Sequence, residues 1–158
     1  MSVAIRPLGT DDIPRLLELI EGLAVYEKLP APSADARGRL AADARAGRFQ
    51  CLLAEVDGQT VGYALYFFTY STFLARPTLY LEDLFVQPEA RGRGAGIGLF
   101  RACAGDAVRN GCGRMEWQVL DWNTPSIAFY ERLGARHLAG WLPFRLDGEA
   151  LQQVGGEQ

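Results

Sequence analysis

The sequence predicts an α/β fold of the α+β type, with a mixed, mostly antiparallel central sheet of about six to seven strands flanked by four helices. Short segments rich in apolar residues alternate with segments in which apolar residues recur at helical spacing. Near the middle, an apolar strand, a glycine-rich turn and a long helical segment follow one another, which is typical of a crossover between parallel strands. The chain of 158 residues is predicted to form a single domain, 1–158, with an ordered core at about 3–150.

Cap and turn residues set the limits of the predicted elements. Thr10 and Ser33 can each cap a helix through a side-chain oxygen. Asp57-Gly58 is typical of a two-residue hairpin turn, and Thr124-Pro125 has the cap and first-turn proline that begin a helix. In chain order we expect a strand at 3–6, helices beginning at residues 11 and 34, strands at 50–56, 59–70 and 79–87, a helix at 94–110, a strand at 114–120, a helix at 124–133 and a hairpin at about 136–146.

The stretch RGRGAGIG, from Arg91 to Gly98, lies between the predicted strand 79–87 and the helix that follows it. The first N–H groups of a helix have no partner within the helix, and the helix dipole favours negative charge there. Glycines let the backbone approach a phosphate closely, and Arg91 and Arg93 add positive charge. The stretch therefore predicts a site for a phosphorylated ligand, the alternative being a glycine-rich turn without one.

The common phosphate-binding motifs do not fit this stretch. No Lys-Ser or Lys-Thr pair follows Gly98, as a P-loop requires, and the dinucleotide pattern G-x-G-x-x-G fails in both registers, at Ile97 and at Leu99. The pattern Arg-x-x-Gly-x-Gly does fit, with Arg91, Gly94 and Gly96. It resembles the pyrophosphate-binding loop of the Gcn5-related N-acetyltransferases, the GNAT superfamily, which hold acetyl-coenzyme A (acetyl-CoA).

Other motifs resemble one branch of that superfamily, the spermidine/spermine (diamine) N-acetyltransferases. They are LAVYEKL at 23–29, YFFTY at 66–70, YLEDLFV at 80–86 and WNTPSIAFYERLGA at 122–135. The resemblance covers about residues 3–150 and implies a GNAT-type fold with acetyl-CoA as co-substrate. It implies that the cofactor is bound by the loop residues Arg91, Gly92, Arg93, Gly94, Ala95, Gly96, Ile97 and Gly98, and by the strand backbone at Leu84, Phe85 and Val86, where the pantetheine arm would pair like an extra strand.

Amine acetylation needs a proton acceptor and a proton donor. An alkyl ammonium is almost fully charged at pH 7, so exposing its lone pair costs about 4.6 kcal/mol. Glu82 and Asp83 are carboxylates in an otherwise apolar strand, and they should face opposite sides unless a bulge intervenes. The resemblance favours Glu82 as the acceptor, acting directly or through water. A structural salt bridge to a nearby arginine is the alternative.

The resemblance implies that Tyr130, in the sequence F-Y-x-x-x-G-A, donates the proton to the departing thiolate and contacts the cofactor. A tyrosine on an amphipathic helix is otherwise a half-buried residue with its hydroxyl in water. Asn123 and Ser126 are also expected to bind the cofactor, with helix capping as the alternative.

The predicted acceptor pocket is less well defined. Glu27, Glu82 and Asp121 are the candidate ammonium contacts, and Phe73 is the aromatic candidate. The loop after Tyr70 contains no carboxylate, unlike that of the polyamine enzymes, and Arg76 would repel a cation there. A thialysine-like amino acid or another small primary amine therefore fits as well as a polyamine or diamine.

Composition narrows the function classes. The formal net charge of −3 argues against nucleic-acid binding, which needs clustered Lys and Arg for phosphate contacts. Three cysteines without C-x-x-C spacing, with one histidine, argue against a zinc site. The N-terminus lacks an apolar signal region and no run of 18 apolar residues occurs, so we expect no membrane association.

The sequence therefore predicts a cytoplasmic, metal-independent, homodimeric N-acetyltransferase that acts by direct attack in a ternary complex. Two alternatives stay open at this point. One is acetylation of a protein or peptide, and the other is a catalytically silent CoA-binding sensor or interaction module.

Overall fold

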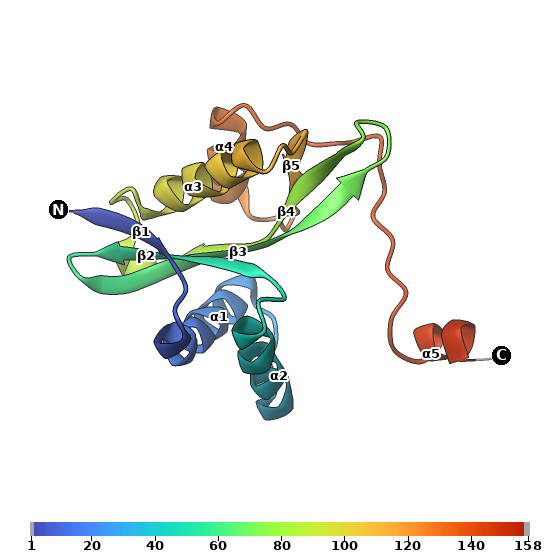
Figure 1. Cartoon of the computed structure of the whole chain (residues 1–158), viewed down its shortest axis with the longest axis horizontal. Helices are drawn as coiled ribbons and strands as arrows, with labels where there is room; N and C mark the ends of the chain where they lie inside the picture. The colour runs from blue at the N-terminus through green and yellow to red at the C-terminus, as the bar shows by residue number, and fades with distance from the viewer. Residues whose placement is uncertain (1, 157–158) are drawn as a thin grey trace. The chain divides into compact units, whose positions relative to one another are not determined.

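The computed structural model describes residues 2–156. The chain divides into two compact units, Met1–Gln118 and Val119–Gln158, and each is described by itself. Figure 1 shows the sheet of the first unit with its helices. That the two units together make one domain stays a prediction.

The first unit contains a sheet of five strands in the order β1-β2-β3-β4-β5. The first four strands pair antiparallel, and β4 pairs parallel with β5 after the crossover helix α3. This confirms the predicted mixed, mostly antiparallel sheet. The strands are β1 (Val3–Pro7), β2 (Gln50–Val56), β3 (Gln59–Ser71), β4 (Arg76–Val86) and β5 (Arg114–Glu116), and α3 is Ala95–Arg109.

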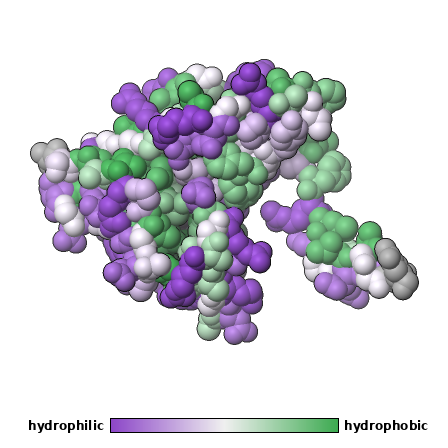
Figure 2. Space-filling model, viewed as in Figure 1, coloured by the Kyte–Doolittle hydropathy of each residue, from purple (hydrophilic) through white to green (hydrophobic). Residues whose placement is uncertain are grey.

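Helices cover both faces of the sheet (Figure 1). Helix α3 packs on one face over a core that includes Leu79, Leu81 and Leu99. Helix α1 (Ile13–Glu27) packs on the other face, where Leu16 and Leu19 belong to a second cluster. Helix α2 (Ala34–Arg45) contacts α1 and has no buried residue, and Figure 2 shows that hydrophilic residues dominate the surface where it lies.

The N-caps predicted at Thr10 and Ser33 have different outcomes. Ser33 caps α2, because its Oγ accepts a hydrogen bond from the N–H of Ala36 at 3.2 Å. The prediction for Thr10 was wrong, since a 3-10 turn, η1 (Thr10–Asp12), precedes α1 and begins after Gly9. The Asp12 carboxylate accepts from the Gly9 N–H at 2.7 Å and from Arg6, which lowers the pKa of Asp12 to about 2. The Asp12 side chain thus bonds back to the N–H of Gly9, three residues earlier, as the third residue of a capping box does, and Thr10 lies inside the turn.

A β-bulge interrupts the pairing of β3 with β4. Leu65 pairs with Asp83, but the next residue, Tyr66, pairs with Leu81, so Glu82 is the extra residue on β4. An extra residue in one strand reverses the alternation of side chains beyond it. The bulge therefore changes which side chains of β4 share a face.

The second unit departs from the prediction. It contains α4 (Thr124–Arg132) and α5 (Gly148–Gly156), and the predicted hairpin at 136–146 is irregular chain in the described residues. The predicted strand 114–120 ends at Glu116. A hairpin needs a neighbouring strand or a covered apolar face to be stable, and Trp141 and Phe144 are 77% and 94% exposed. The sheet thus has five strands rather than six to seven, and residues 2–156 form five α-helices rather than four.

Within residues 2–156, none of the helices is long and apolar enough to cross a membrane.

Candidate active site

The glycine-rich loop ends at the N-terminus of α3, as the sequence predicts. Gly92 and Gly94 have φ values of 77° and 92°, which side chains other than glycine rarely adopt. Gly94 is the N-cap, and no side chain caps this helix end. The first-turn N–H groups of α3 are therefore available to an anion, and the helix dipole favours its charge.

Two further glycines of the loop, Gly96 and Gly98, occupy their positions for reasons other than a positive φ. A Cβ built on Gly98 would lie 3.2 Å from Cδ1 of Ile5, so Gly98 lets α3 pack closely on β1. A Cβ on Gly96 would meet only Cγ2 of Val86, at 3.9 Å, which is an ordinary contact. Neither φ nor packing requires glycine at position 96. Space for a ligand at the helix N-terminus would require glycine at this position.

The side chain of Arg91 contacts other parts of the protein, so phosphate binding is not its only possible role. Its Nε donates a hydrogen bond to the carbonyl oxygen of Val86 at 2.9 Å. Its guanidinium carbon lies 4.5 Å from the ring centroid of Tyr26 and 5.9 Å from that of Phe85. Arg91 thus connects the loop with the end of β4 and with α1.

The edge of β4 beside the loop is open on one side. β5 pairs with β4 only from Thr78 to Tyr80. From Leu81 to Val86, within the described chain, β4 has a strand neighbour only in β3. The backbone of this part of β4, Leu84 to Val86, therefore lies where a polyamide arm can pair as an additional strand, with the Val86 carbonyl oxygen already accepting from Arg91.

Glu82 and Asp83 lie on the same side of the sheet because of the bulge. Leu81 and Leu84 belong to the α3 face, whereas Phe85 packs with the α1 cluster, so Asp83 also faces α1. Asp83 accepts a hydrogen bond from the hydroxyl of the buried Tyr63 at 2.9 Å. Glu82 is exposed, and the structure gives it no ion pair among residues 2–156, so the salt-bridge alternative has no support there.

These carboxylates and Glu27, the last residue of α1, form an acidic cluster: Glu27, Glu82 and Asp83. The pKa of Asp83 is raised to about 6, chiefly by burial and also by the charges of Glu82 and Glu27, while the Tyr63 hydrogen bond acts in the opposite direction. Burial and the charge of Glu82 also raise the pKa of Glu27. The three groups repel one another, and a bound cation would relieve that repulsion.

Asp83→Asn is expected to stabilise the protein at neutral pH. The folded-state pKa lies above the ordinary value of 3.8, so the folded state binds the proton more tightly and loses stability as pH rises from about 4 to about 6. The variant should gain up to roughly 3 kcal/mol of unfolding free energy at about pH 7 and nothing at about pH 4. Urea denaturation at both pH values measures this, with the surface variant Glu89→Gln as control. A gain of the same size at both pH values would contradict the account.

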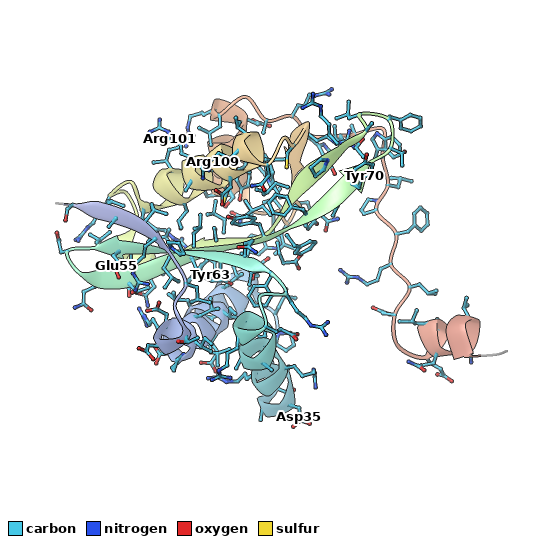
Figure 3. All side chains as sticks on the ribbon, in the orientation of Figure 1. Asp35, Glu55, Tyr63, Tyr70, Arg101 and Arg109 are labelled. Atoms are coloured by element: carbon cyan, nitrogen blue, oxygen red, sulfur yellow. The ribbon has the colours of Figure 1, made fainter. Side chains whose placement is uncertain are left out.

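Phe73, the predicted aromatic contact, and Arg76, the predicted repelling charge, lie toward the hairpin between β3 and β4. Phe73 is fully exposed in the loop between β3 and β4, and Arg76 begins β4. Six residues separate Arg76 from Glu82 along the strand, a distance of roughly 20 Å. Figure 3 shows Tyr63 in the middle part of β3 and Tyr70 toward its hairpin end; these two residues pair with Phe85 and Pro77 of β4. Arg76 is therefore distant from the acidic cluster along β4, and a substrate contact by Phe73 stays a prediction.

The remaining predicted residues belong to the second unit. Tyr130 lies in α4 and packs its ring edge-on against Phe129, with centroids 5.4 Å apart. The N-cap of α4 is Asn123, whose side-chain oxygen accepts from the N–H of Ser126 at 3.4 Å, so Thr124 is the first helical residue rather than the predicted cap. Asp121 is exposed. The capping alternative for Asn123 is thus realised, and a cofactor contact by Asn123, Ser126 or Tyr130 stays a prediction.

The sequence interpretation missed the positions of Asp83, Tyr63 and Tyr26. The sequence leaves open whether Glu82 and Asp83 face opposite sides or share one through a bulge, and the structure has the bulge. No local pattern points to Tyr63 or Tyr26, because their partners, Asp83 and Arg91, are distant in the sequence.

Known proteins resemble this chain in sequence and in fold. The model of the acetyltransferase (GNAT) family matches residues 14–135. A thialysine N-epsilon-acetyltransferase of the pig, Sus scrofa, is 39% identical over 99% of both chains. A human spermidine/spermine N(1)-acetyltransferase-like protein 1 is 35% identical over 98% of this chain and 24% of its own length.

Among solved structures, an integron cassette protein from V. cholerae superposes with a TM-score of 0.82 at 24% identity, covering 99% of both chains, which shows the same fold. The family match spans most of the chain, and the curated relatives align along nearly all of it. The chain therefore belongs to the GNAT family of N-acetyltransferases.

Proposed function

We propose that this enzyme transfers the acetyl group of acetyl-CoA to a small primary amine by direct attack in a ternary complex. The observation that carries the proposal is the bulge in β4, which places Glu82 beside Glu27 and Asp83 next to the open edge of the same strand. The carboxylates proposed as proton acceptor and ammonium contacts and the backbone edge proposed for the pantetheine arm thus lie on β4 and at the end of α1.

In this proposal the cofactor's pyrophosphate binds the loop Arg91–Gly98 and the N-terminus of α3. The uncapped helix end, the positive φ values of Gly92 and Gly94 and the clearance at Gly96 support it. The backbone of Leu84, Phe85 and Val86 holds the pantetheine arm. A backbone N–H near Phe85 is suited to polarise the thioester carbonyl.

Gly96→Ala is expected to weaken CoA binding by about tenfold or more without destabilising the fold, because the added methyl fills space that the protein itself does not need. Alanine even favours a helix over glycine by up to about 1 kcal/mol. Calorimetric titration with CoA and thermal unfolding measure the two effects. In the matched variant Gly98→Ala the methyl meets Ile5, so that variant should lower the melting temperature. Unchanged CoA affinity in Gly96→Ala would remove this loop end from the cofactor site.

The chemical step balances with two protein groups. Glu82, directly or through water, takes the proton of the ammonium, and the freed lone pair forms the new C–N bond at the thioester carbon. The C–S bond then breaks. Tyr130 donates its hydroxyl proton to the departing thiolate, and the second proton that the nitrogen loses as the amide forms restores the Tyr130 hydroxyl. No metal ion has a role in this scheme.

The acidic cluster favours a compact acceptor. Its three carboxylates lie at the end of α1 and at one bulge, so they can neutralise one or two nearby positive charges. The hairpin loop 72–75 contains no carboxylate for the far charge of a long polyamine. The similarity to the pig thialysine enzyme supports the same class, so we infer an amino acid with an ammonium on its side chain, or a short diamine, as acceptor.

The test is release of CoA thiol from acetyl-CoA in the presence of single amines: thialysine, lysine, ornithine, putrescine, spermidine and short peptides. Stimulation by the lysine-like amino acids or by putrescine supports the proposal. Stimulation by peptides alone would favour the protein N-acetyltransferase alternative. Binding of CoA without turnover of any amine would favour the silent CoA-binding module.

A homodimer and a cytoplasmic location are further parts of the proposal. Phe73 and Phe144, which are 100% and 94% exposed, are apolar side chains of the kind that a second copy would cover. Their exposure supports self-association.

A further inference from the structure

Arg91 touches three parts of the proposed site at once. The residue itself begins the glycine-rich loop, its Nε donates to the carbonyl oxygen of Val86 at the end of β4, and its guanidinium lies over the ring of Tyr26 near the end of α1. We propose that Arg91 is a positioning residue for the amine acceptor: it holds the last turn of α1, and with it Glu27, against β4. The inference rests on the proposed function, since it assigns a role within that site.

The contacts of α1 show why its last turn needs such a tie. The helix ends at Glu27, and Lys28 follows in the left-handed region with φ 59°. The preceding turn lies close to Phe85, because a Cβ at Gly22 would be 3.0 Å from its ring. Phe85 is thus packed against α1. The guanidinium carbon of Arg91 lies near two aromatic rings, 5.9 Å from the Phe85 centroid and 4.5 Å from the Tyr26 centroid.

The chemistry of arginine suits this position. A planar guanidinium can stack on an aromatic ring while its edge donates a hydrogen bond, whereas a lysine ammonium cannot do both in one geometry. The bond from Nε to Val86 fixes the plane of the group, and the ring of Tyr26 lies across it. Because Tyr26 and Glu27 are adjacent, fixing the ring fixes the backbone that carries the carboxylate.

The alternative is that the Arg91 side chain acts on the cofactor alone, as its charge in the sequence predicts. The two roles differ in what they change. A cofactor contact alters the KM of acetyl-CoA, whereas a tie to α1 alters the KM of the amine. Arg93, two residues along the same loop and exposed, provides a matched loss of charge without these ring contacts.

The experiment compares Arg91→Ala, Arg91→Lys, Tyr26→Leu and Arg93→Ala in steady-state kinetics with both substrates varied. Arg91→Ala should raise the KM of the amine by about tenfold, with no rescue by lysine. Tyr26→Leu should raise the KM of the amine by a similar factor. The double variant Arg91→Ala/Tyr26→Leu should raise this KM no further than either single change does. Arg93→Ala should act on the KM of acetyl-CoA. Effects of Arg91→Ala confined to acetyl-CoA would overturn the proposal, and so would full rescue by Arg91→Lys.

Hydrogen exchange of the ligand-free variants separates this inference from the proposed function. Amides of residues 24–29 should exchange faster in Arg91→Ala than in the wild type, and at the wild-type rate in Arg93→Ala. Equal exchange in all three proteins would overturn the role of Arg91. If the wild type turns over no amine, the proposed function fails, while exchange still decides whether Arg91 holds the turn.

Discussion

Tyr130→Phe should lower kcat by about two to three orders of magnitude and change the Kd of acetyl-CoA by less than about twofold, because general-acid catalysis contributes that much to rate and little to ground-state binding. The variant removes only the phenolic oxygen. The proton that the thiolate needs must then come from water. Steady-state kinetics and calorimetric titration with acetyl-CoA measure the two quantities separately.

The aromatic ring that this variant retains would keep the edge-on packing against Phe129, so a folding defect is not expected. Thermal unfolding of the variant provides the control. An unchanged kcat would remove Tyr130 from the mechanism. A loss of cofactor affinity as large as the loss of kcat would make it a binding residue.

Glu82→Gln should lower kcat/KM at neutral pH by about a hundredfold and shift the pH–rate profile to higher pH. Glutamine has nearly the same shape but cannot take the ammonium proton. The variant then depends on the fraction of free amine in solution, which rises about tenfold per pH unit up to about pH 10.4. Rates of thiol release measured across the alkaline range give the profile.

Asp83→Asn is the matched control, because it removes a neighbouring carboxylate from the same bulge. It should raise the KM of the amine more than it changes the shape of the profile. An identical profile for Glu82→Gln and wild type would return Glu82 to a structural role. A shift in Asp83→Asn instead would make Asp83 the proton acceptor.

Features fixed by neighbouring residues could be predicted from the sequence. The strand 50–56, the Asp57-Gly58 turn and the Ser33 cap depend on adjacent residues, and each forms as expected. The glycine-rich loop at the start of α3 likewise depends on its own glycines. The family followed from such local motifs in combination, and the comparisons confirm it.

Features that depend on pairing between distant segments could not be predicted. Whether Glu82 and Asp83 share a face is decided by the register of β4 against β3, which neither strand specifies alone. The charge of Arg91 predicts a phosphate contact. Its contact with the ring of Tyr26 depends on how α1 packs beside β4, which the sequence around Arg91 does not specify. The hairpin predicted at 136–146 is irregular chain in the described residues, because a hairpin needs a neighbouring strand or a covered apolar face that the segment itself does not supply.

The measurement that tests the central claim most directly is product analysis of the wild-type enzyme with acetyl-CoA and a lysine-like amino acid. Mass spectrometry should find one N-acetylated amine for each CoA thiol released, with acetylation on the side-chain nitrogen and no acetylated enzyme when the amine is omitted. Thiol release without an acetylated amine, or an acetyl group retained on the protein, would contradict direct transfer in a ternary complex.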